Sequence, residues 1–322
     1  AGAGYGVGID QGGKYYQWGV LTRRMERIPS FMGPLEKVSA GYDHILALDM
    51  MGNVYSWGSE QFGLGMVPLE LSSENIRQLE AGHQFSVALT EEGQIYFWGN
   101  DNIVNVNTEK EEGNIAEVAI NTSTIIARTK DGRVTTLSTI ESPFTRIPES
   151  IQEHTVSIAS TDAVAAALLD DGTVVTWGKM GDAAVDVPEE IQGNVKQISS
   201  GRNHFSVTLK DGSVASWGDN SVKQTNAPNL SNIDRVSAGY HQNYAVDKSG
   251  KVHTWGLKGY IMGTDQYGRD MFQRLAEGGK MTMTVGAIAV IISAVIGIII
   301  GGIAGYYGGR IDNFLMRIAA II

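Results

Sequence analysis

The sequence contains no cysteine, 6 histidines and only 7 prolines among its 322 residues. Without cysteine, the chain has no disulfide framework, no zinc–thiolate site and no thiolate nucleophile. The histidines form neither an HExxH motif nor a paired metal-ligand spacing, and no GxSxG motif or pair of catalytic carboxylates stands out. The sequence therefore indicates no catalytic residues, no metal site and no cofactor, and we do not expect an enzyme.

Positive charge is scarce in the first four fifths of the chain. The whole chain has 25 Lys and Arg and 35 Asp and Glu; 6 and 4 of these lie from Lys258 onward, so 19 and 31 remain before it. An acidic surface repels the phosphates of nucleic acids, so we expect no nucleic-acid partner. The same charge favours cationic partners, or serves only to keep the domain soluble.

A repeat of about forty residues runs through the acidic part. Every tryptophan stands before a glycine, at spacings of 39, 41, 79, 40 and 38 residues. The double spacing contains a seventh unit, in which Leu137 takes the tryptophan position five residues after Gly132. A period of this size indicates a propeller or a solenoid. The tryptophans of the predicted repeat core are Trp18, Trp57, Trp98, Trp177, Trp217 and Trp255.

Each unit has the pattern of consecutive antiparallel strands. In "VSAGYDHILALDMMGNVYSWG", a short strand leads to Ala40-Gly41, an apolar strand follows, and a turn at Met51-Gly52 precedes an alternating strand. The pattern resembles the seven-bladed propeller of the regulator of chromosome condensation family, with its repeat AGxxH…L…G…V…WG. The resemblance implies an all-β seven-bladed propeller over residues 1–256 and says little about function, because one fold serves many functions.

Two departures from the repeat lead to expectations about regularity and closure. The fourth unit, "VAINTSTIIARTKDGRVTTL", and the fifth, "IASTDAVAAALL", have lost repeat residues, so these blades are expected to be the least regular. No strand follows Gly256 and none precedes Gly2, although about twenty residues with a strand separate the other units. We expect the strand that completes the ring to lie before Ala1.

An uncharged stretch from Met281 to Gly309 follows the repeats. Within it, Val285 to Ala304 supplies the ~20 apolar residues that a membrane-spanning helix needs. Small residues recur every four positions and would let another helix approach closely, although glycine here could instead serve helix flexibility. The predicted helix-packing residues are Ser293, Gly297, Gly301 and Gly305.

Motifs on both sides of this stretch resemble the second subunit type of dipeptide and oligopeptide ABC-transporter permeases. The pattern is GTDxxGRDxxxRL before the apolar stretch and AGYYGGxxDxxxMR after it. Its matches before the stretch are Gly263, Thr264, Asp265, Gly268, Arg269, Asp270, Arg274 and Leu275. Its matches after the stretch are Gly305, Tyr306, Tyr307, Gly308, Gly309, Asp312, Met316 and Arg317.

The resemblance covers about the last sixty residues and divides the remainder of the chain. Residues 257–280 form a linker and an interfacial helix, and residues 281–322 form the truncated start of a permease transmembrane domain. We expect a short helix from Gln266 to Ala276, with Thr264 or Asp265 at its N-cap. The Asp and Arg residues of the motif are more consistent with a structural role than with direct contact to substrate.

The resemblance implies a multi-pass subunit of a bacterial cell membrane, with the propeller inserted outside the cell as a docking or capture surface. Its implied partners are membrane lipid, a second permease subunit, cytoplasmic ATPase subunits and an extracytoplasmic peptide-binding protein. The alternative is a membrane-tethered binding or inhibitory module without transport. A nucleotide-exchange factor is disfavoured, because a propeller outside the cell never meets a cytoplasmic GTPase.

Three further motifs have structural interpretations. "GIDQGGKY" resembles the start of a phosphate-binding loop but lacks its Ser or Thr and falls on a hairpin turn. His44 and His204 occupy the same repeat position, which favours packed, hydrogen-bonded histidines. Asp170-Asp171 and Asp211 precede turn glycines, where Asp bonds its own backbone.

Overall fold

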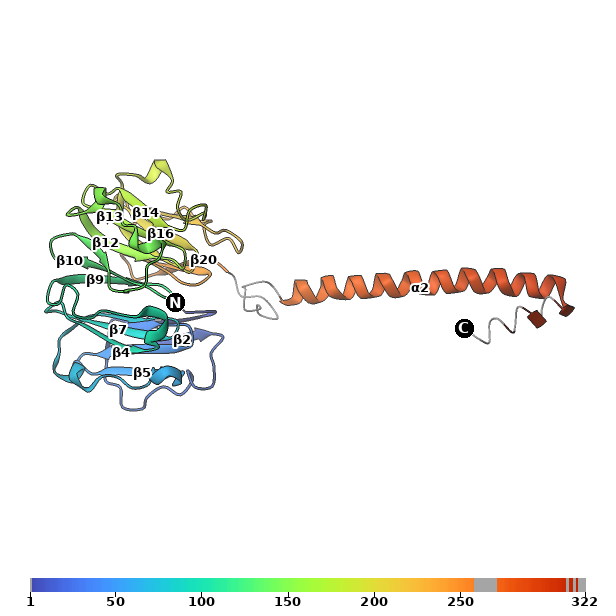
Figure 1. Ribbon diagram of the computed structural model, residues 1–322, viewed down its shortest axis with the longest axis horizontal. Coiled ribbons are helices and arrows are strands. Elements are labelled where there is room, and N and C mark those ends of the chain that lie inside the picture. Colours follow the sequence, from blue (N-terminus) through green and yellow to red (C-terminus); the bar gives the residue numbers. More distant parts are fainter. Residues whose placement is uncertain (1, 258–270, 311–312, 315–316, 318–322) are drawn as a thin grey trace. The chain divides into compact units, whose positions relative to one another are not determined.

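The computed structural model describes residues 2–257, 271–310, 313–314 and 317 (Figure 1). The chain divides into two compact units, Ala1–Lys258 and Gly259–Ile322. The first unit is a β-propeller and the second contains one long helix. The motif residues Gly263 to Asp270 and the predicted start of the short helix lie outside the described residues.

Seven antiparallel sheets make up the described part of the first unit, and they form blades one to seven in chain order. Blade one pairs β1 (Tyr5–Ile9) with β2 (Tyr15–Gly19). The other blades have three strands each: β3 (Leu35–Ala40), β4 (His44–Asp49) and β5 (Val54–Gly58); β6 (Ile76–Ala81), β7 (Phe85–Thr90) and β8 (Ile95–Gly99); β9 (Ile115–Ile120), β10 (Ile125–Thr129) and β11 (Val134–Thr136); β12 (Thr155–Ser160), β13 (Val164–Leu169) and β14 (Val174–Gly178); β15 (Val195–Ser200), β16 (His204–Leu209) and β17 (Val214–Gly218); β18 (Ile233–Ala238), β19 (Gln242–Asp247) and β20 (Val252–Gly256).

Short helical turns connect some of the strands. The propeller contains a four-residue helix, α1 (Asp101–Val104), in a region where the sequence pattern predicted no helix. Asn100 caps α1 by accepting a hydrogen bond from the backbone of Asn102. Single turns of 3-10 helix lie at Gln61–Gly63, Leu69–Ser73, Pro143–Thr145, Glu149–Ile151 and Glu189–Ile191.

The hairpin between the middle and outer strands follows from an Asp and a Gly in the repeat. In blade two, one carboxylate oxygen of Asp49 accepts hydrogen bonds from the backbone N–H groups of Met51 and Asn53, both at 2.9 Å. Gly52 has a φ of 90°, which residues with a Cβ rarely adopt. This turn sets the register that pairs Ile45 with Trp57.

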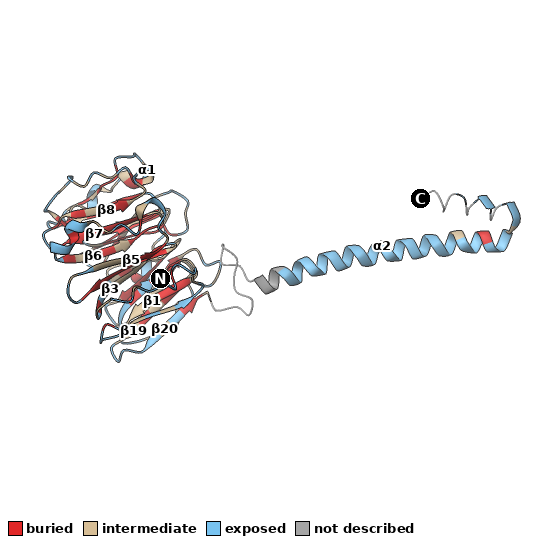
Figure 2. Ribbon diagram, turned by 90° about the horizontal axis from the view of Figure 1, so that it is seen from below, coloured by how far each residue is buried: buried red, intermediate tan, exposed pale blue. Residues whose placement is uncertain are grey.

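The tryptophans pack between neighbouring blades. The indole N–H of Trp57 donates to the carbonyl of Met25, and that of Trp217 donates to the carbonyl of Ala184, both at 3.1 Å. These carbonyls belong to the connection that precedes the blade, so each tryptophan joins its own blade to the previous segment. Apolar clusters of buried residues fill the spaces between consecutive blades (Figure 2).

The predicted propeller with seven repeat units is confirmed, and two details of its blades are now clear. The fourth blade is irregular as predicted, because β11 has only three residues and Leu137 is fully buried in the tryptophan position. The prediction for the fifth blade was wrong. Its strands β12 to β14 have full length, since the small side chains Ala165, Ala166 and Ala167 fill the middle strand without voids and Trp177 is retained.

The ring has a seam between blades seven and one. The two-stranded sheet of blade one confirms that this blade lacks an inner strand within the described residues. None of the six apolar clusters formed by the described residues joins β18–β20 to β1–β2. Instead, Trp18 donates a hydrogen bond to the Tyr244 hydroxyl at 2.9 Å across the seam.

The second unit contains one continuous helix, α2 (Met271–Tyr307), of 37 residues. Its segment Leu275–Tyr307 is long and apolar enough to cross a membrane, judged by length and composition. At 1.5 Å per residue, these 33 residues measure about 50 Å, which exceeds a hydrocarbon core of about 30 Å. The predicted short helix does not end at Ala276. It continues into the apolar segment, because Gly278 and Gly279 lower helix propensity without breaking the helix.

Candidate functional site

The inner strands of the blades line a cavity of about 830 Å³ in the propeller. Residues of β3, β6, β9, β12, β15 and β18 contribute to its wall, together with β1 and its neighbours at the seam. We call this cavity the channel. Since every inner strand supplies residues to it, the channel is the place where side chains from all repeats come together.

Five residues from five different repeats form a cluster at the loops between inner and middle strands. They follow the small-residue step of their repeats, and all of them line the channel. We call them the mouth cluster: Tyr42, His83, Asp162, Arg202 and Tyr240.

The members of the mouth cluster are held together by aromatic and ionic contacts. The rings of Tyr42 and His83 lie 4.3 Å apart between centroids. The Arg202 Nε donates to a carboxylate oxygen of Asp162 at 3.2 Å, and its guanidinium carbon lies 5.5 Å from the centroid of the Tyr240 ring. This arrangement combines a cation, a carboxylate and aromatic surface, which suits binding of polar peptide groups.

Burial changes the protonation behaviour of two cluster members. Desolvation raises the pKa of the Asp162 carboxyl, although the Arg202 cation opposes this effect. Desolvation also raises the pKa of the Tyr240 hydroxyl, and the nearby Asp162 carboxylate adds to the shift. The Tyr240 hydroxyl therefore stays protonated near pH 7 and serves as a hydrogen-bond donor.

Two glutamates lie on the channel wall. Glu117 accepts hydrogen bonds from Arg128 Nε at 3.0 Å and from the Ser157 hydroxyl at 2.9 Å. Glu80 accepts one from the Gln78 amide at 2.7 Å. Desolvation raises the pKa of Glu80 to about 7, and the neighbouring charge of Glu117 contributes to this rise. Desolvation also raises the pKa of Glu117, while Arg128 acts in the opposite direction.

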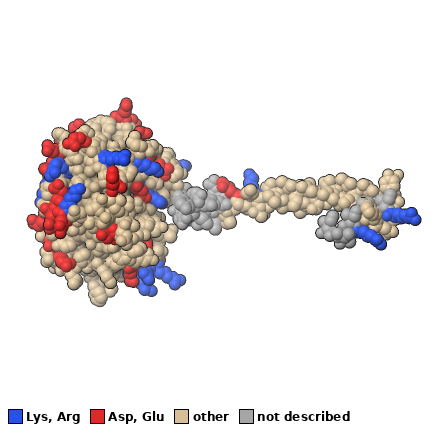
Figure 3. Space-filling model, viewed as in Figure 1, with Lys and Arg blue, Asp and Glu red and all other residues tan. Residues whose placement is uncertain are grey.

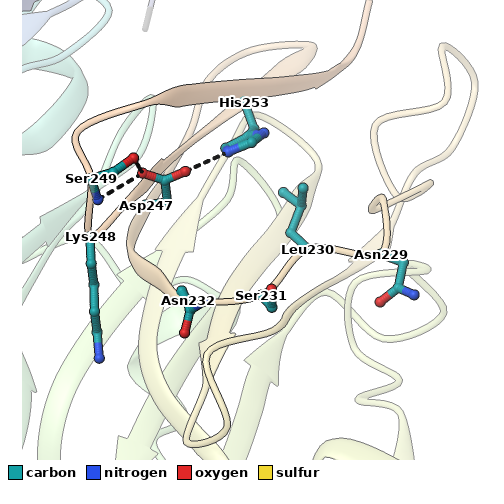
Figure 4. A pocket seen from close by; sticks show the side chains of 8 residues that line it. All are labelled: Asn229, Leu230, Ser231, Asn232, Asp247, Lys248, Ser249 and His253. Carbon is teal, nitrogen blue, oxygen red and sulfur yellow. Dashed lines mark hydrogen bonds and ion pairs between the residues drawn. The ribbon is translucent and has the colours of Figure 1, made fainter.

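A second cavity, of about 560 Å³, lies beside the hairpin turn of blade seven (Figure 4). There His253 Nε2 lies 3.0 Å from Asp247, and the Ser249 hydroxyl donates to the same carboxylate. Ser249 thus contacts the acid and not the base, so no hydroxyl is activated for attack. Tyr55 bonds Asp49 in the same way in blade two, which makes the Asp247 arrangement a feature of the repeat turn.

The histidines singled out from the sequence are structural, as predicted. His44 and His204 are fully buried, and their Nε2 atoms lie 2.8 Å from Ser86 and Asn243 of the next blade. Desolvation lowers the pKa of His44 to about 4, so His44 is neutral near pH 7. These contacts fasten one blade to the next.

The acidic turn residues and the phosphate-loop motif also have structural roles. Asp171 and Asp211 accept hydrogen bonds from the backbone two residues later, at 2.8 Å in each case. Asp170 departs from this pattern, and its carboxylate lies 3.4 Å from His154. In "GIDQGGKY", Asp10 accepts from the backbone of Gly12 within the hairpin turn, which confirms the turn.

Part of the permease motif lies on α2 and its C-terminal end. Tyr306 and Tyr307 close the helix with their rings 5.0 Å apart, and Gly308 and Gly309 follow with φ values of 56° and 58°. Arg274 belongs to α2, while Asp312 and Met316 lie outside the described residues. The roles of these motif residues remain predictions.

The predicted helix-packing residues lie on α2 without contacts from the described part of the chain. A Cβ built at any of Gly297, Gly301 and Gly305 would meet no atom within 4 Å, apart from the helix's own nearby backbone. Charged side chains are scattered over the propeller and nearly absent from the apolar helix (Figure 3). This face is consistent with packing against another helix, which stays a prediction.

Sequence comparison supports the repeat assignment. The family model described as regulator of chromosome condensation (RCC1) repeat matches residues 36–64 and 195–224. These matches fall on blades two and six, which keep the repeat residues most completely.

Curated relatives of the chain are peptide permeases. The dipeptide transport system permease protein DppC of Bacillus subtilis is 48% identical over 60 residues, which is 19% of this chain and 19% of the relative. The oligopeptide transport system permease protein OppC of Haemophilus influenzae is 43% identical over 67 residues, covering 20% of this chain and 22% of the relative. The chain spans about a fifth of the length of the curated relatives it matches.

Solved structures resemble the propeller in fold. The CRINKLY WD40 ectodomain of the Arabidopsis thaliana receptor kinase ACR4 has a TM-score of 0.60 at 17% identity, covering 79% of this chain and 90% of that one. Prp20p from Saccharomyces cerevisiae has a TM-score of 0.57 at 21% identity, covering 70% of this chain and 72% of that one. The chain thus joins a propeller similar to regulator of chromosome condensation repeat proteins to a segment similar to dipeptide and oligopeptide permeases.

Proposed function

We propose that the chain is part of a bacterial peptide-transporter permease subunit that carries an extracytoplasmic β-propeller. The likeness to DppC and OppC carries this proposal, because 48% identity over 60 residues comes with a long apolar helix flanked by motif residues. Residues 1–256 would be the propeller, residues 257–280 the connection, and residues 281–322 the beginning of the transmembrane domain. The subunit itself performs no chemistry.

The partners of the subunit follow from the same likeness. A second permease subunit would pack against the small-residue face of α2, at Gly297 and Gly301. ATPase subunits would supply the energy from the cytoplasmic side, and an extracytoplasmic binding protein would deliver peptide. Membrane lipid would surround the remainder of the helix, whose side chains are mostly exposed.

The propeller would serve as a docking or capture surface through the channel and its mouth cluster. The cluster offers Arg202, Asp162 and aromatic rings at one opening, so it can bind charged and apolar groups of a peptide or of the binding protein. The excess of acidic residues in the propeller favours cationic ligands. The absence of a nucleophile contacting a base among the described residues fits binding without catalysis.

Transport by the full-length subunit tests the proposal. The subunit would be reconstituted in proteoliposomes with its second permease subunit and ATPase subunits, and uptake of labelled dipeptides and oligopeptides would be measured with and without ATP. We expect uptake only with ATP. Peptide binding to the propeller without any ATP-dependent uptake would contradict the transport function and favour a tethered binding module.

A further inference from the structure

We propose that the open edge of β1 is a binding site for an extended peptide, which adds to blade one as its third strand. The inference names the site and the ligand class for the capture surface, and it rests on the proposed function for taking peptide cargo as the ligand. Strand addition to an exposed sheet edge is a general mode of peptide binding.

The edge of β1 presents backbone hydrogen-bonding groups to the channel. The backbone N–H of Asp10 donates to Lys14 in the hairpin at 3.1 Å, so Asp10 bonds toward β2. Because bonding direction alternates along an antiparallel strand, Val7 and Ile9 turn their N–H and C=O groups to the opposite edge. Val7 and Ile9 both line the channel, and β1 pairs only with β2 among the described strands.

The other six blades show which sequence fits this position. Their inner strands read LEKVSA, IRQLEA, IAEVAI, TVSIAS, VKQISS and IDRVSA. The fourth residue is aliphatic in all of these strands, and the fifth and sixth are mostly small. In blade two, the third and fifth inner-strand residues pair with Leu48 and Leu46, the counterparts of Ile9 and Val7.

Apolar surface beside the edge lacks the cover that it has elsewhere in the ring. Trp18 is 41% exposed, whereas its counterpart Trp217 is 5% exposed. Val38, at the fourth position of β3, is half-buried, although its counterparts in the other inner strands are all buried. Val252, on the blade-seven side, is 56% exposed and also lines the channel. An added strand would cover all three side chains.

The site is formed in advance of binding, which suits a ligand that comes and goes. The hydrogen bond from Trp18 to the Tyr244 hydroxyl bridges the seam, and the two rings contact edge to face at 5.6 Å. Tyr5, which is 1% exposed, donates to the carbonyl of Gly41 at 2.8 Å and holds β1 against blade two. Recognition through the backbone tolerates many sequences, as an oligopeptide site requires.

Binding of a designed hexapeptide to the full-length protein in detergent micelles tests the inference. The probe is fluorescein-labelled LEKVSA, the sequence of β3. N-methylation of its third and fifth residues removes the N–H groups that would face β1. We expect this change to weaken binding by roughly tenfold or more, because two backbone hydrogen bonds are lost.

N-methylation of the fourth and sixth residues is the matched control. In the other blades the fourth N–H points away from the middle strand, since Val118 and Val236 donate theirs to Gln78 and Gln197 of the preceding blade. This peptide should lose much less affinity. Equal losses for both methylated peptides would overturn the proposal, because strand pairing would then not determine binding.

A variant pair tests the same contact from the protein side. Val7→Pro removes the N–H at the open edge, whereas Val7→Thr keeps it with a similar shape, and circular dichroism confirms folding of both. Only Val7→Pro should lose the probe. Failure of the full-length protein to bind LEKVSA would overturn the proposal, including the case in which a strand of the same polypeptide already occupies the edge. ATP-driven uptake without probe binding would leave the transport function standing.

Discussion

At the scale of single residues, the propeller depends on a few side chains that connect each blade to its neighbour. Trp217 is buried and bonds the preceding connection, and His204 bonds Asn243 of the next blade. Trp18 occupies the same repeat position at the seam, where it bonds only the Tyr244 hydroxyl. The same residue type therefore contributes different amounts of stability at different places in the ring.

Replacing two tryptophans should reveal this difference. Trp217→Ala leaves a cavity between blades and should lower the free energy of unfolding by about 3–5 kcal/mol. Trp18→Ala should cost only about 1–2 kcal/mol, because much of its ring is already in water. Urea unfolding of the full chain in detergent, followed by far-ultraviolet circular dichroism, measures both values. Equal losses would show that the seam is as tightly packed as the other interfaces.

The Glu80 carboxyl should make stability depend on pH. Its pKa is raised to about 7 by burial, from an ordinary value of 4.5, so the folded state holds a proton that the unfolded chain releases between these values. Stability should therefore fall as pH rises from about 4.5 to 7.

Glu80→Gln removes this charge and should stabilise the protein by about 1–3 kcal/mol at alkaline pH, with little gain in acid. Thermal unfolding at pH values above and below this window checks the expectation. The exposed Glu92→Gln serves as the control and should change stability equally at both pH values. A pH-independent effect of Glu80→Gln would contradict the raised pKa.

At the scale of elements, the sequence predicted the repeating strands better than the helix boundaries. Hydrophobic alternation and turn glycines repeat seven times, so each blade confirms the others. The boundary near Lys280 had only the start of the uncharged stretch to mark it, and α2 passes through it without a break. The mouth cluster was not predicted, because its residues differ between repeats and Tyr42 meets His83 only after the blades are arranged in a ring.

The small-residue face of α2 leads to a prediction about assembly. Gly301→Leu places a bulky side chain where another helix would approach, and should reduce co-purification with the second permease subunit severalfold. Ile299→Leu changes a residue on nearly the opposite side of the helix and should leave co-purification unchanged. Membrane insertion of both variants is checked by carbonate extraction. Normal assembly of Gly301→Leu would remove this face from the interface.

At the scale of the whole molecule, the propeller and the apolar helix require a defined membrane topology. The repeats and the permease motif are each recognisable in the sequence, so the two units and their order were predictable. The side of the membrane on which the propeller lies follows from the permease likeness alone, because Lys and Arg flank the span on both sides.

A protease site inserted after Met180 tests the topology. Met180 lies in a loop and is 85% exposed, so an insertion there should be tolerated. A protease added to intact spheroplasts should cleave the full-length subunit at this site, while the same site in a cytosolic marker stays intact. Protection of the propeller until the cells are lysed would place it in the cytoplasm.

The seam also determines how the folded ring fluctuates. Six interfaces are fastened by apolar clusters, so the first cooperative opening should occur where blade seven meets blade one. Hydrogen–deuterium exchange should therefore be faster in β1 and β20 than in β15 to β17. The molecule would behave as a split ring, in which slow exchange reports the six fastened interfaces and fast exchange reports the one that opens.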